Sequence, residues 1–329
     1  MNKKALITGI SGQDGSYLAE LLLDLQYEVF GFVKAKDLEN PTLTLRNIAH
    51  LLDRVKLYSV DFNNFQDISQ KIERIKPLEV YHFAASSFVS FSFEDEFSIM
   101  EMNSRGTHYL ISAIYKIVPE CKFYFAGSSE MFGDVLSSPQ DENTIFRPRT
   151  IYGISKVVGH ELIRNYREKR NMFACSGILY NHESPRRAEE FVTRKITRSA
   201  AKIKLKMAQK IELGNIDALR DWGFAKDYVE AIYRMMQLPN PQDFVIGTGT
   251  LHSVREFLEI AFGELGLDYQ KYLEINPVYI RPCEKIQLVA NPQKANKILD
   301  WKPKVSFSEL VKMMVRRDFQ DLNSGIQES

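Results

Sequence analysis

The sequence predicts an α/β protein in which a doubly wound parallel sheet forms a first domain and a smaller α/β lobe follows it. Three observations support this prediction. Short apolar runs alternate with longer helical stretches through the first 180 residues, a glycine-rich turn follows the first run, and the pattern changes after Asn181. At 329 residues the chain is long enough for two folded units.

The apolar runs of the first 180 residues each have about the length of one strand. They are residues 5–8, 29–33, 55–59, 80–84, 123–126 and 174–179. The segments between most of them are long enough for the crossover helices that parallel strands require. Residues 36–46, which include Asn40 and Pro41, interrupt this alternation and predict an irregular loop.

After Asn181 the sequence predicts polar helices at 188–206 and 254–266, broken by short strands at 211–214 and 244–247. Near the end, apolar residues at helical spacing predict a helix that faces the core, namely Phe307, Leu310, Val311, Met314 and Val315. We therefore expect a first domain at residues 1–180 and a second lobe at residues 181–329. Some segments of the second lobe should return to the first domain, and the tail after Asn323 should fray.

The composition argues against several classes of function. The 43 basic and 42 acidic residues leave a formal net charge of +1, which gives no support to a nucleic-acid binder. With 44% hydrophobic and 26% charged residues, the chain as a whole is not intrinsically disordered. The apolar run that follows the first lysines is too short for a signal peptide or a membrane span, so we expect a cytoplasmic protein with no membrane partner.

The cysteines and histidines predict neither disulfides nor a metal site. Cys121, Cys175 and Cys283 lie far apart with no CxxC pair, which fits a reducing compartment. The six histidines do not fall at metal-ligand spacing.

The first expected strand runs directly into the turn GISGQDG, from Gly9 to Gly15, and then into a helix with periodic apolar residues. Glycines allow the tight turn, and the free N–H groups at the start of the helix can bind a pyrophosphate. The spacing is one residue wider than the usual dinucleotide fingerprint, but strand, turn and helix occur in the expected order. The turn therefore predicts a dinucleotide site, with a purely packing role as the alternative.

The residues after the second expected strand bear on the choice of dinucleotide. An NAD site usually has an acidic residue at the end of this strand. This chain has Lys34 and Lys36 there, with an acid only at Asp37. Cations suit a 2′-phosphate, so the sequence favours NADP over NAD, although two solvated lysines would give the same pattern. After the third expected strand, Asp61 could reach the adenine amino group.

Tyr152 and Lys156 form a candidate catalytic pair in the segment IYGISK. Four residues make about one helical turn, so both side chains should emerge on one face of a helix. A tyrosine phenol has an ordinary pKa of about 10 and is a poor base near neutral pH. We expect the neighbouring ammonium and an oxidised nicotinamide to lower the pKa of Tyr152.

A second candidate pair, Ser128 and Glu130, follows the fifth expected strand in FYFAGSSEMFG. Ligands in this architecture bind at the carboxyl ends of parallel strands. Ser128 could donate a hydrogen bond to the oxygen that Tyr152 deprotonates, and Glu130 would be a carboxylate near the same atoms. The alternative makes Ser128 a helix cap and Glu130 a solvated loop residue.

These segments together resemble the GDP-mannose 4,6-dehydratase family of extended short-chain dehydrogenase/reductases, which have a Rossmann-type fold. The resemblance covers most of the chain, and its specific parts are GQDGSYLAE, NHESPRR, FVTRKITR, LGNIDALRDWGFAKDYV and RPCE. It implies an NADP site that involves Gly9, Ser11, Gly12, Gln13, Asp14, Gly15, Lys34, Asp61, Phe62, Ala84, Tyr152, Lys156, His182 and Arg187. It also implies a GDP-sugar site that involves Ser87, Asn181, Val192, Lys195, Leu213, Asn215, Arg220, Arg281 and Glu284.

The resemblance further implies a lyase with an internal redox cycle. Tyr152 would take the proton of the sugar 4-hydroxyl as hydride leaves C4, Glu130 would serve the loss of water across C5 and C6, and hydride would return to C6. It also implies a homodimer or homotetramer. The chain departs from the family at Ser128, where threonine is usual, at Phe88, where histidine is common, and in KAKDLENPTLTLR, where the family loop is rich in arginine and serine.

Three alternatives remain open on the sequence alone. The substrate could be a related GDP-sugar such as a manno-heptose. The chain could be a reductase or epimerase of a 4-keto sugar, because GSSE and YGISK also resemble the GDP-4-keto-6-deoxymannose reductases. It could also be a nucleotide-sensing protein without catalysis.

Overall fold

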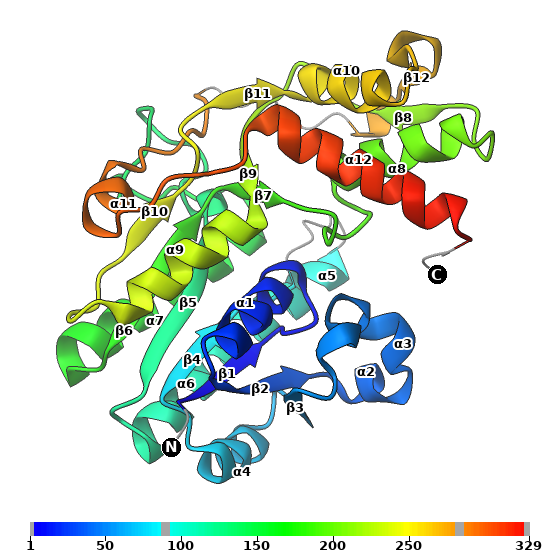
Figure 1. The fold of residues 1–329 in the computed structure, drawn as a ribbon. Helices are drawn as coiled ribbons and strands as arrows, with labels where there is room; N and C mark the ends of the chain where they lie inside the picture. Colours follow the sequence, from blue (N-terminus) through cyan, green and yellow to red (C-terminus); the bar gives the residue numbers. More distant parts are fainter. Residues whose placement is uncertain (1–2, 87–92, 280–285, 326–329) are drawn as a thin grey trace.

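A seven-stranded parallel sheet forms the centre of the first domain (Figure 1). The computed structural model describes residues 3–86, 93–279 and 286–325. The strand order is β10-β6-β5-β4-β1-β2-β3, and every neighbouring pair is parallel. The strands are β1 (Lys4–Thr8), β2 (Glu28–Val33), β3 (Val55–Ser59), β4 (Glu79–His82), β5 (Lys122–Ser128), β6 (Ala174–Leu179) and β10 (Phe244–Ile246). The α/β fold class and the six strands expected in the first 180 residues are confirmed.

The strand at 244–246 corrects one expectation. The sequence analysis placed it in the second lobe, but β10 pairs with β6 at the edge of the main sheet. All three of its residues are fully buried, because helices cover the Phe244 and Ile246 side and a cluster with Phe132 and Ala290 covers the Val245 side. A strand this short carries no local signal that tells which sheet it joins.

Helices cover the two faces of the main sheet, and alternate residues of each strand point to opposite faces. On β1, Ala5 and Ile7 pack with helices α1 (Gln13–Asp24) and α9 (Ala225–Gln237). Leu6 packs on the other face, with helices α4 (Phe65–Ile75), α6 (Gly106–Ile117) and α7 (Ile151–Arg170). Helix α9 thus lies beside α1, although it comes after residue 181 in the chain (Figure 1).

The segment between β2 and β3 is helical rather than irregular. It contains α2 (Ala35–Glu39), α3 (Pro41–Thr44) and the 3₁₀ helix η1 (Arg46–Leu51). Pro41 occupies the first position of α3, where its missing N–H has no helical partner to lose. The Asn-Pro sequence therefore separates two short helices instead of indicating a loop. Between β4 and β5 lie α5 (Phe93–Met100) and the π-helical turn η2 (Glu101–Arg105), which leads into α6.

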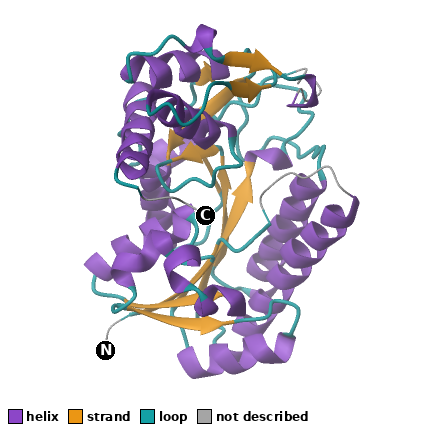
Figure 2. Cartoon of the chain, turned by 90° about the vertical axis from the view of Figure 1, so that its right-hand side faces the viewer, coloured by secondary structure: helices purple, strands orange, loops and turns teal. Residues whose placement is uncertain are grey.

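The second lobe consists of helices packed on two small sheets (Figure 2). One sheet has the order β11 (Leu251–Ser253), β9 (Leu219–Phe224), β7 (Asn181–Glu183), and the other pairs β12 (Leu273–Ile275) with β8 (Ile211–Leu213). The helices are α8 (Val192–Lys204), α10 (Val254–Glu264) and α12 (Phe307–Asn323). The remaining helices after β6 are η4 (Tyr269–Lys271), η5 (Pro277–Tyr279) and α11 (Gln293–Ile298), and η3 (Ser129–Met131) follows β5.

The apolar periodicity near the end of the chain is confirmed as a core-facing helix. Four of its five residues, Leu310, Val311, Met314 and Val315, are buried in the core of the second lobe, and Phe307 packs against that core. Helix α8 starts at Val192 and not at 188, because the preceding residues form a loop at the mouth of the cavity described next.

Candidate active site

A cavity of about 910 Å³ lies between the carboxyl ends of the main-sheet strands and the second lobe. Its walls come from the glycine turn, the ends of β2, β5 and β6, the first turn of α7, and segments of the second lobe from β7 to β9. The cavity volume is in the range that binding sites for small molecules and cofactors have.

The glycine turn fits a dinucleotide pyrophosphate. Gly9 has a φ of +72°, which favours glycine, and a Cβ at Gly15 would lie 2.2 Å from the Gly9 carbonyl oxygen. Gly12 caps the start of α1 without any side chain, so the first N–H groups of the helix face the cavity. The predicted residues Ser11, Gln13 and Asp14 also line the cavity, as does Ala84 against the turn.

The end of β2 contributes both a cation and an acid to the cavity. Lys34 and Asp37 line it together with Phe62. The Asp37 carboxylate accepts the backbone N–H of Lys34 at 3.1 Å and so caps α2. Asp61 does not line the cavity: its carboxylate accepts the backbone N–H of Asn63 at 2.9 Å within the loop after β3.

Helix α7 presents Tyr152 and Lys156 to the cavity from its first two turns. The helix is capped by the Thr150 hydroxyl, which accepts the Gly153 N–H at 3.0 Å. The Lys156 Nζ donates to the Ala126 carbonyl oxygen of β5 at 2.8 Å and lies 5.7 Å from the centre of the Tyr152 ring. Burial lowers the pKa of Lys156 to about 8, because little solvent reaches its ammonium.

The pKa of Tyr152 reflects the protein groups alone, whereas the expected lowering included the charge of an oxidised nicotinamide. Burial raises the pKa to about 12; a hydrogen bond from the Ser128 hydroxyl opposes this, and the charge of Glu130 adds to it. The protein groups alone therefore keep the phenol neutral, and the proximity of Lys156 does not overcome the loss of solvation. Sequence spacing predicted the pair correctly but could not reveal how deeply it is buried.

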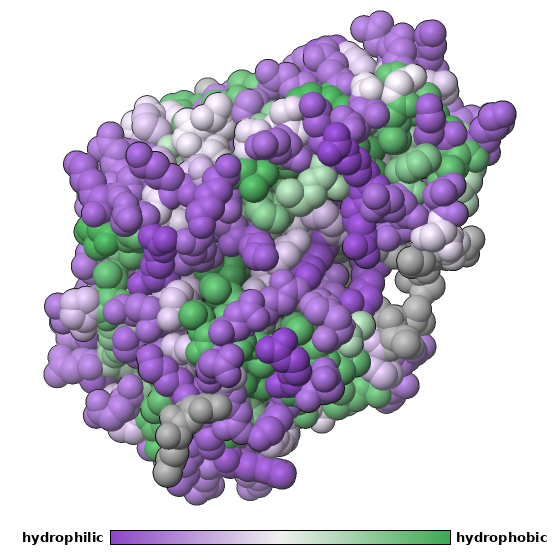
Figure 3. Space-filling view, viewed as in Figure 1, coloured by the Kyte–Doolittle hydropathy of each residue, from purple (hydrophilic) through white to green (hydrophobic). Residues whose placement is uncertain are grey.

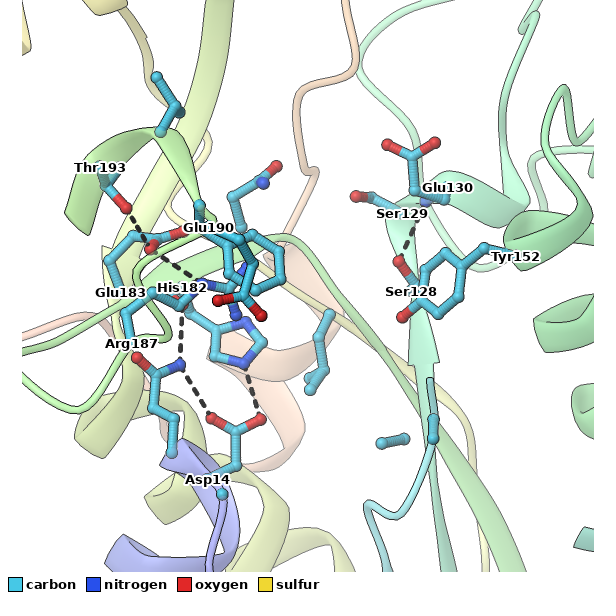
Figure 4. Close-up of a pocket in the computed structure, with 18 of the residues that line it drawn as sticks. Asp14, Ser128, Ser129, Glu130, Tyr152, His182, Glu183, Arg187, Glu190 and Thr193 are labelled. Carbon is cyan, nitrogen blue, oxygen red and sulfur yellow. Dashed lines mark hydrogen bonds and ion pairs between the residues drawn. The ribbon is translucent and has the colours of Figure 1, made fainter. Parts of the chain in front are cut away.

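Ser128 and Glu130 lie beside Tyr152 at the carboxyl end of β5 (Figure 4). The Ser128 hydroxyl accepts the Glu130 backbone N–H at 3.2 Å and so caps η3, while it also bonds the Tyr152 phenol. The two interpretations of Ser128, cap and site residue, are thus compatible. Across the cavity in Figure 4 lie Asp14, His182 and Arg187.

The second lobe supplies the opposite wall. The predicted residues found there are Asn181, His182, Arg187, Val192, Lys195, Leu213, Asn215 and Arg220. The Lys195 Nζ lies 4.0 Å from the centre of the Tyr279 ring. The predicted residues Ser87, Arg281 and Glu284, and also Phe88, lie outside the described residues.

Several residues that line this wall were not predicted, chiefly Glu183, Glu190, Thr193 and Tyr279. Glu183 is buried; its carboxylate accepts the Thr193 hydroxyl at 2.6 Å and pairs with the Arg187 guanidinium at 3.2 Å. The NHESPRR segment contains Glu183 and Arg187 four residues apart, which was the available signal for this pair.

Among residues 3–86, 93–279 and 286–325, no group of three or more histidine, cysteine or acidic side chains is arranged to hold a metal ion. Within the same residues, the helices are all too short or too polar to cross a bilayer.

Comparison with known proteins gives one consistent result. A family model described as GDP-mannose 4,6 dehydratase matches residues 6–314. GDP-mannose 4,6 dehydratase 2 of Arabidopsis thaliana is 46% identical over 97% of this chain and 87% of its own length. A protein of the same name from Caenorhabditis elegans is 45% identical over 96% of this chain and 89% of its own length.

Solved structures share the fold at lower identity. The dTDP-glucose 4,6-dehydratase of Bacillus anthracis in complex with NAD has a TM-score of 0.85 at 18% identity, over 99% of this chain and 100% of that one. The RMD of Pseudomonas aeruginosa complexed with NADPH has a TM-score of 0.81 at 19% identity, over 97% of this chain and 99% of that one.

Proposed function

The chain belongs to the GDP-mannose 4,6-dehydratase family, and we propose that it converts GDP-mannose into GDP-4-keto-6-deoxymannose with NADP that is recycled in each turnover. The observation that carries this proposal is the Ser128–Tyr152 hydroxyl pair with Glu130 beside it, at the end of β5 and in the same cavity as the glycine turn. Such a site can remove a hydroxyl proton and has a carboxylate free for a second proton transfer.

In the first step, Tyr152 takes the proton of the sugar 4-hydroxyl and Ser128 hydrogen-bonds the same oxygen. An oxidised nicotinamide dinucleotide held by the glycine turn and Lys156 would supply the hydride acceptor for C4 and the hydride donor for C6. Because the surrounding protein raises the pKa of Tyr152 to about 12, proton transfer to this residue requires a positive charge that arrives with the ligands.

In the second step, Glu130 removes the C5 proton, which the C4 ketone has made acidic. The same carboxyl group then protonates the departing C6 hydroxyl, so that water leaves. When hydride returns to C6, C5 takes up a proton, and the proton that Tyr152 took from the 4-hydroxyl balances this uptake. Ser128 is the N-cap of η3 and Glu130 lies within that turn, and both residues line the cavity.

Lys156 and the second lobe hold the ligands. Lys156 is fixed by the Ala126 carbonyl and can donate its remaining N–H groups to the cofactor ribose. Asn181, Lys195 and Arg220 provide an amide and two cations for the sugar diphosphate, where the planar guanidinium suits bidentate phosphate contacts.

The reaction is tested by incubating the protein with GDP-mannose and catalytic NADP but no reductant. We expect a product lighter by one water, with no net change at the nicotinamide absorbance. Tyr152→Phe should lower turnover by at least about a hundredfold. Glu130→Gln should allow C4 oxidation, seen as reduced nicotinamide, and block the loss of water. Net consumption of NADPH would instead indicate a reductase, and turnover of a GDP-manno-heptose alone would identify a different sugar.

The preference for NADP over NAD is part of the proposal. Lys34 at the end of β2 lines the cavity and offers a cation to a 2′-phosphate, while Asp37 beside it is engaged in capping α2. Isothermal titration of both dinucleotides into the wild type and into Lys34→Met tests this point. We expect the variant to lose affinity for NADP only; equal losses for both would contradict the assignment.

We also propose a cytoplasmic homodimer or homotetramer. Cys121 and Cys175 are free and buried, which fits a reducing compartment. Helices α5 and α7 pack together, and each exposes an apolar side chain, Phe97 and Ile154, which a second copy could cover. Analytical ultracentrifugation of the wild type and of Phe97→Glu tests the assembly.

A further inference from the structure

The two family segments GQDGSYLAE and NHESPRR lie against each other at the junction between α1 and β7. The Gln13 side chain bonds this segment twice. Its Nε2 donates to the His182 carbonyl oxygen at 3.0 Å, and its Oε1 accepts the Ser184 hydroxyl at 2.8 Å. Gln13 and Ser184 are both buried, so these bonds are shielded from water.

Arg186 makes a second connection one turn further along α1. Its guanidinium donates to the Ser16 hydroxyl at 3.0 Å, pairs with the Glu20 carboxylate, and lies 4.0 Å from the centre of the Tyr17 ring. The NHESPRR segment is therefore attached to α1 over more than one helical turn.

Between these two connections, Asp14 meets His182. The His182 Nε2 lies 2.8 Å from the Asp14 carboxylate, and its Nδ1 lies 2.7 Å from the Tyr180 carbonyl oxygen. A carbonyl oxygen accepts hydrogen bonds but cannot donate one, and the same is true of an ionised carboxylate. Each ring nitrogen must then carry a proton, which makes His182 an imidazolium.

The environment supports this charge state. Burial opposes the charge on His182, but the adjacent Asp14 carboxylate outweighs it and raises the pKa of the imidazole. Burial likewise opposes ionisation of Asp14, yet His182 and Arg187 hold its pKa below the ordinary value. The imidazole also stacks on the Tyr228 ring, with 4.9 Å between the ring centres.

We propose that Asp14 is a positioning residue that holds His182 as an imidazolium, and that this ion pair clamps the cofactor turn to the second lobe. Both ring N–H groups of His182 are occupied by protein acceptors. The other oxygen of Asp14 accepts the Gln13 amide at 3.2 Å, so protein groups contact the ion pair on both sides.

The clamp has a consequence for the site because His182 lies directly between residues that line the cavity. Asn181 precedes it on β7, and Arg187 follows in the loop. While the ion pair is intact, these two side chains are held at a fixed position relative to the glycine turn. The effect on ligand affinity rests on the proposed function, whereas the charge state of His182 does not.

The stability that the clamp contributes should fall at both high and low pH. The pKa of His182 is raised by folding, so its contribution to stability is complete below about pH 6.5 and is lost as the pH rises through the raised value. The pKa of Asp14 is lowered, so its contribution is complete above about pH 4 and is lost as the pH falls through the lowered value. The other titratable or charged groups that face the pair are Arg187, Lys156, Tyr17, Tyr124, Tyr152 and Tyr228.

The charge state is tested by NMR of the full chain labelled with ¹⁵N-histidine. The His182 signals are assigned from their loss in His182→Gln. At about pH 7.5, a unit above the ordinary histidine pKa, we expect imidazolium shifts for His182. His160 is an internal control, since burial lowers its pKa and it should give neutral shifts. A neutral His182 in the wild type would overturn the proposal without any variant.

The role of Asp14 is tested with Asp14→Asn, which keeps the shape and can donate its amide to a neutral imidazole. We expect His182 to become neutral at about pH 7.5 and the affinity for NADP, measured by titration calorimetry, to fall about tenfold. Glu264→Gln, which removes an exposed ion pair of α10 and α12, should change neither quantity. An imidazolium that persists in Asp14→Asn, or an unchanged affinity once His182 is neutral, would refute the clamp. A failed dehydration assay with normal His182 shifts would refute only the proposed function.

Discussion

At the scale of single residues, the site contains two groups whose pKa values the protein shifts so that the neutral form of each is favoured. Lys156 has a pKa of about 8 and Tyr152 of about 12, and burial is the main cause of both shifts. The sequence predicted the pair from its four-residue spacing, because a helix brings such residues to one face. It could not predict the direction of the tyrosine shift, because residue spacing does not reveal how much solvent reaches the phenol.

Replacement of Lys156 by methionine should stabilise the fold while it removes activity. A pKa of about 8 in place of 10.5 corresponds to about 3 kcal/mol against the charged lysine in the folded state. The folded pKa is lowered, so this penalty is complete below about pH 8 and disappears as the pH rises toward 10.5. We expect urea unfolding at pH 7 to give a higher free energy for Lys156→Met, and the wild type alone to gain stability above pH 8.

The exposed Lys116 of α6 provides the matched control, and Lys116→Met should change the free energy of unfolding by no more than about 0.5 kcal/mol. A Lys156→Met variant that is less stable than the wild type at neutral pH would contradict this prediction. It would show that the packing and hydrogen bond of the lysine stabilise the fold by more than the burial of its charge destabilises it.

At the scale of elements, the first β-strand, the glycine turn and α1 form one rigid unit in which each glycine has a different task. Gly9 supplies the left-handed backbone, Gly12 leaves the start of the helix without a side-chain cap, and Gly15 lets the helix pack closely against the turn. This unit was predictable because its information is local. The short helices at 35–51 and the sheet that β10 joins were not predictable, because packing against the rest of the protein decides both.

Gly15→Ala should disrupt this unit. The added Cβ would lie 2.2 Å from the Gly9 carbonyl oxygen and 2.8 Å from the Ile10 Cα, both of which are backbone atoms and cannot rotate away. We expect a loss of about 2–4 kcal/mol in the free energy of unfolding, in the upper range of single substitutions, together with loss of measurable dinucleotide binding.

Gly263→Ala in α10 tests whether this effect is specific to the turn. No atom lies within 4 Å of the added Cβ, so the usual helix preference for alanine should stabilise the protein by up to about 1 kcal/mol. Normal dinucleotide affinity in Gly15→Ala would show that the turn can shift to accommodate the Cβ. The close packing of α1 against the turn would then not be needed for dinucleotide binding.

At the scale of the whole molecule, the two lobes are interleaved rather than joined in series. Helix α9 and strand β10 pack on the first domain, and α1 is attached to the NHESPRR segment. The face in Figure 3 is mostly hydrophilic, with apolar side chains in small scattered groups, as the balanced composition leads one to expect. We propose that anion recognition is local to the cavity, where Lys195 and Arg220 lie, so the net charge of +1 carries no information about it.

The C-terminal helix α12 supports the cavity from a distance, through a buried ion pair with α8. The Arg194 Nε lies 2.8 Å from the Asp318 carboxylate, and both side chains are almost fully buried. The same guanidinium donates to the carbonyl oxygens of Pro185 and Arg187 in the loop that reaches the cofactor turn. Sequence reasoning identified α12 only as a core helix, because the distance of 124 residues between the partners hides the pair.

Asp318→Ala should therefore destabilise the protein and weaken its ligand site together. Removal of Asp318 takes a buried carboxylate away from the Arg194 guanidinium, which costs about 3–5 kcal/mol in the free energy of unfolding. Arg194 would move toward solvent and release the loop at residues 185–187, so the affinity for NADP should fall as well. In Glu264→Gln, which removes the exposed pair that Arg316 makes across α10 and α12, we expect a loss below about 1 kcal/mol and unchanged affinity. If Asp318→Ala lost stability but bound NADP as the wild type does, α12 would stabilise the second lobe without positioning the loop.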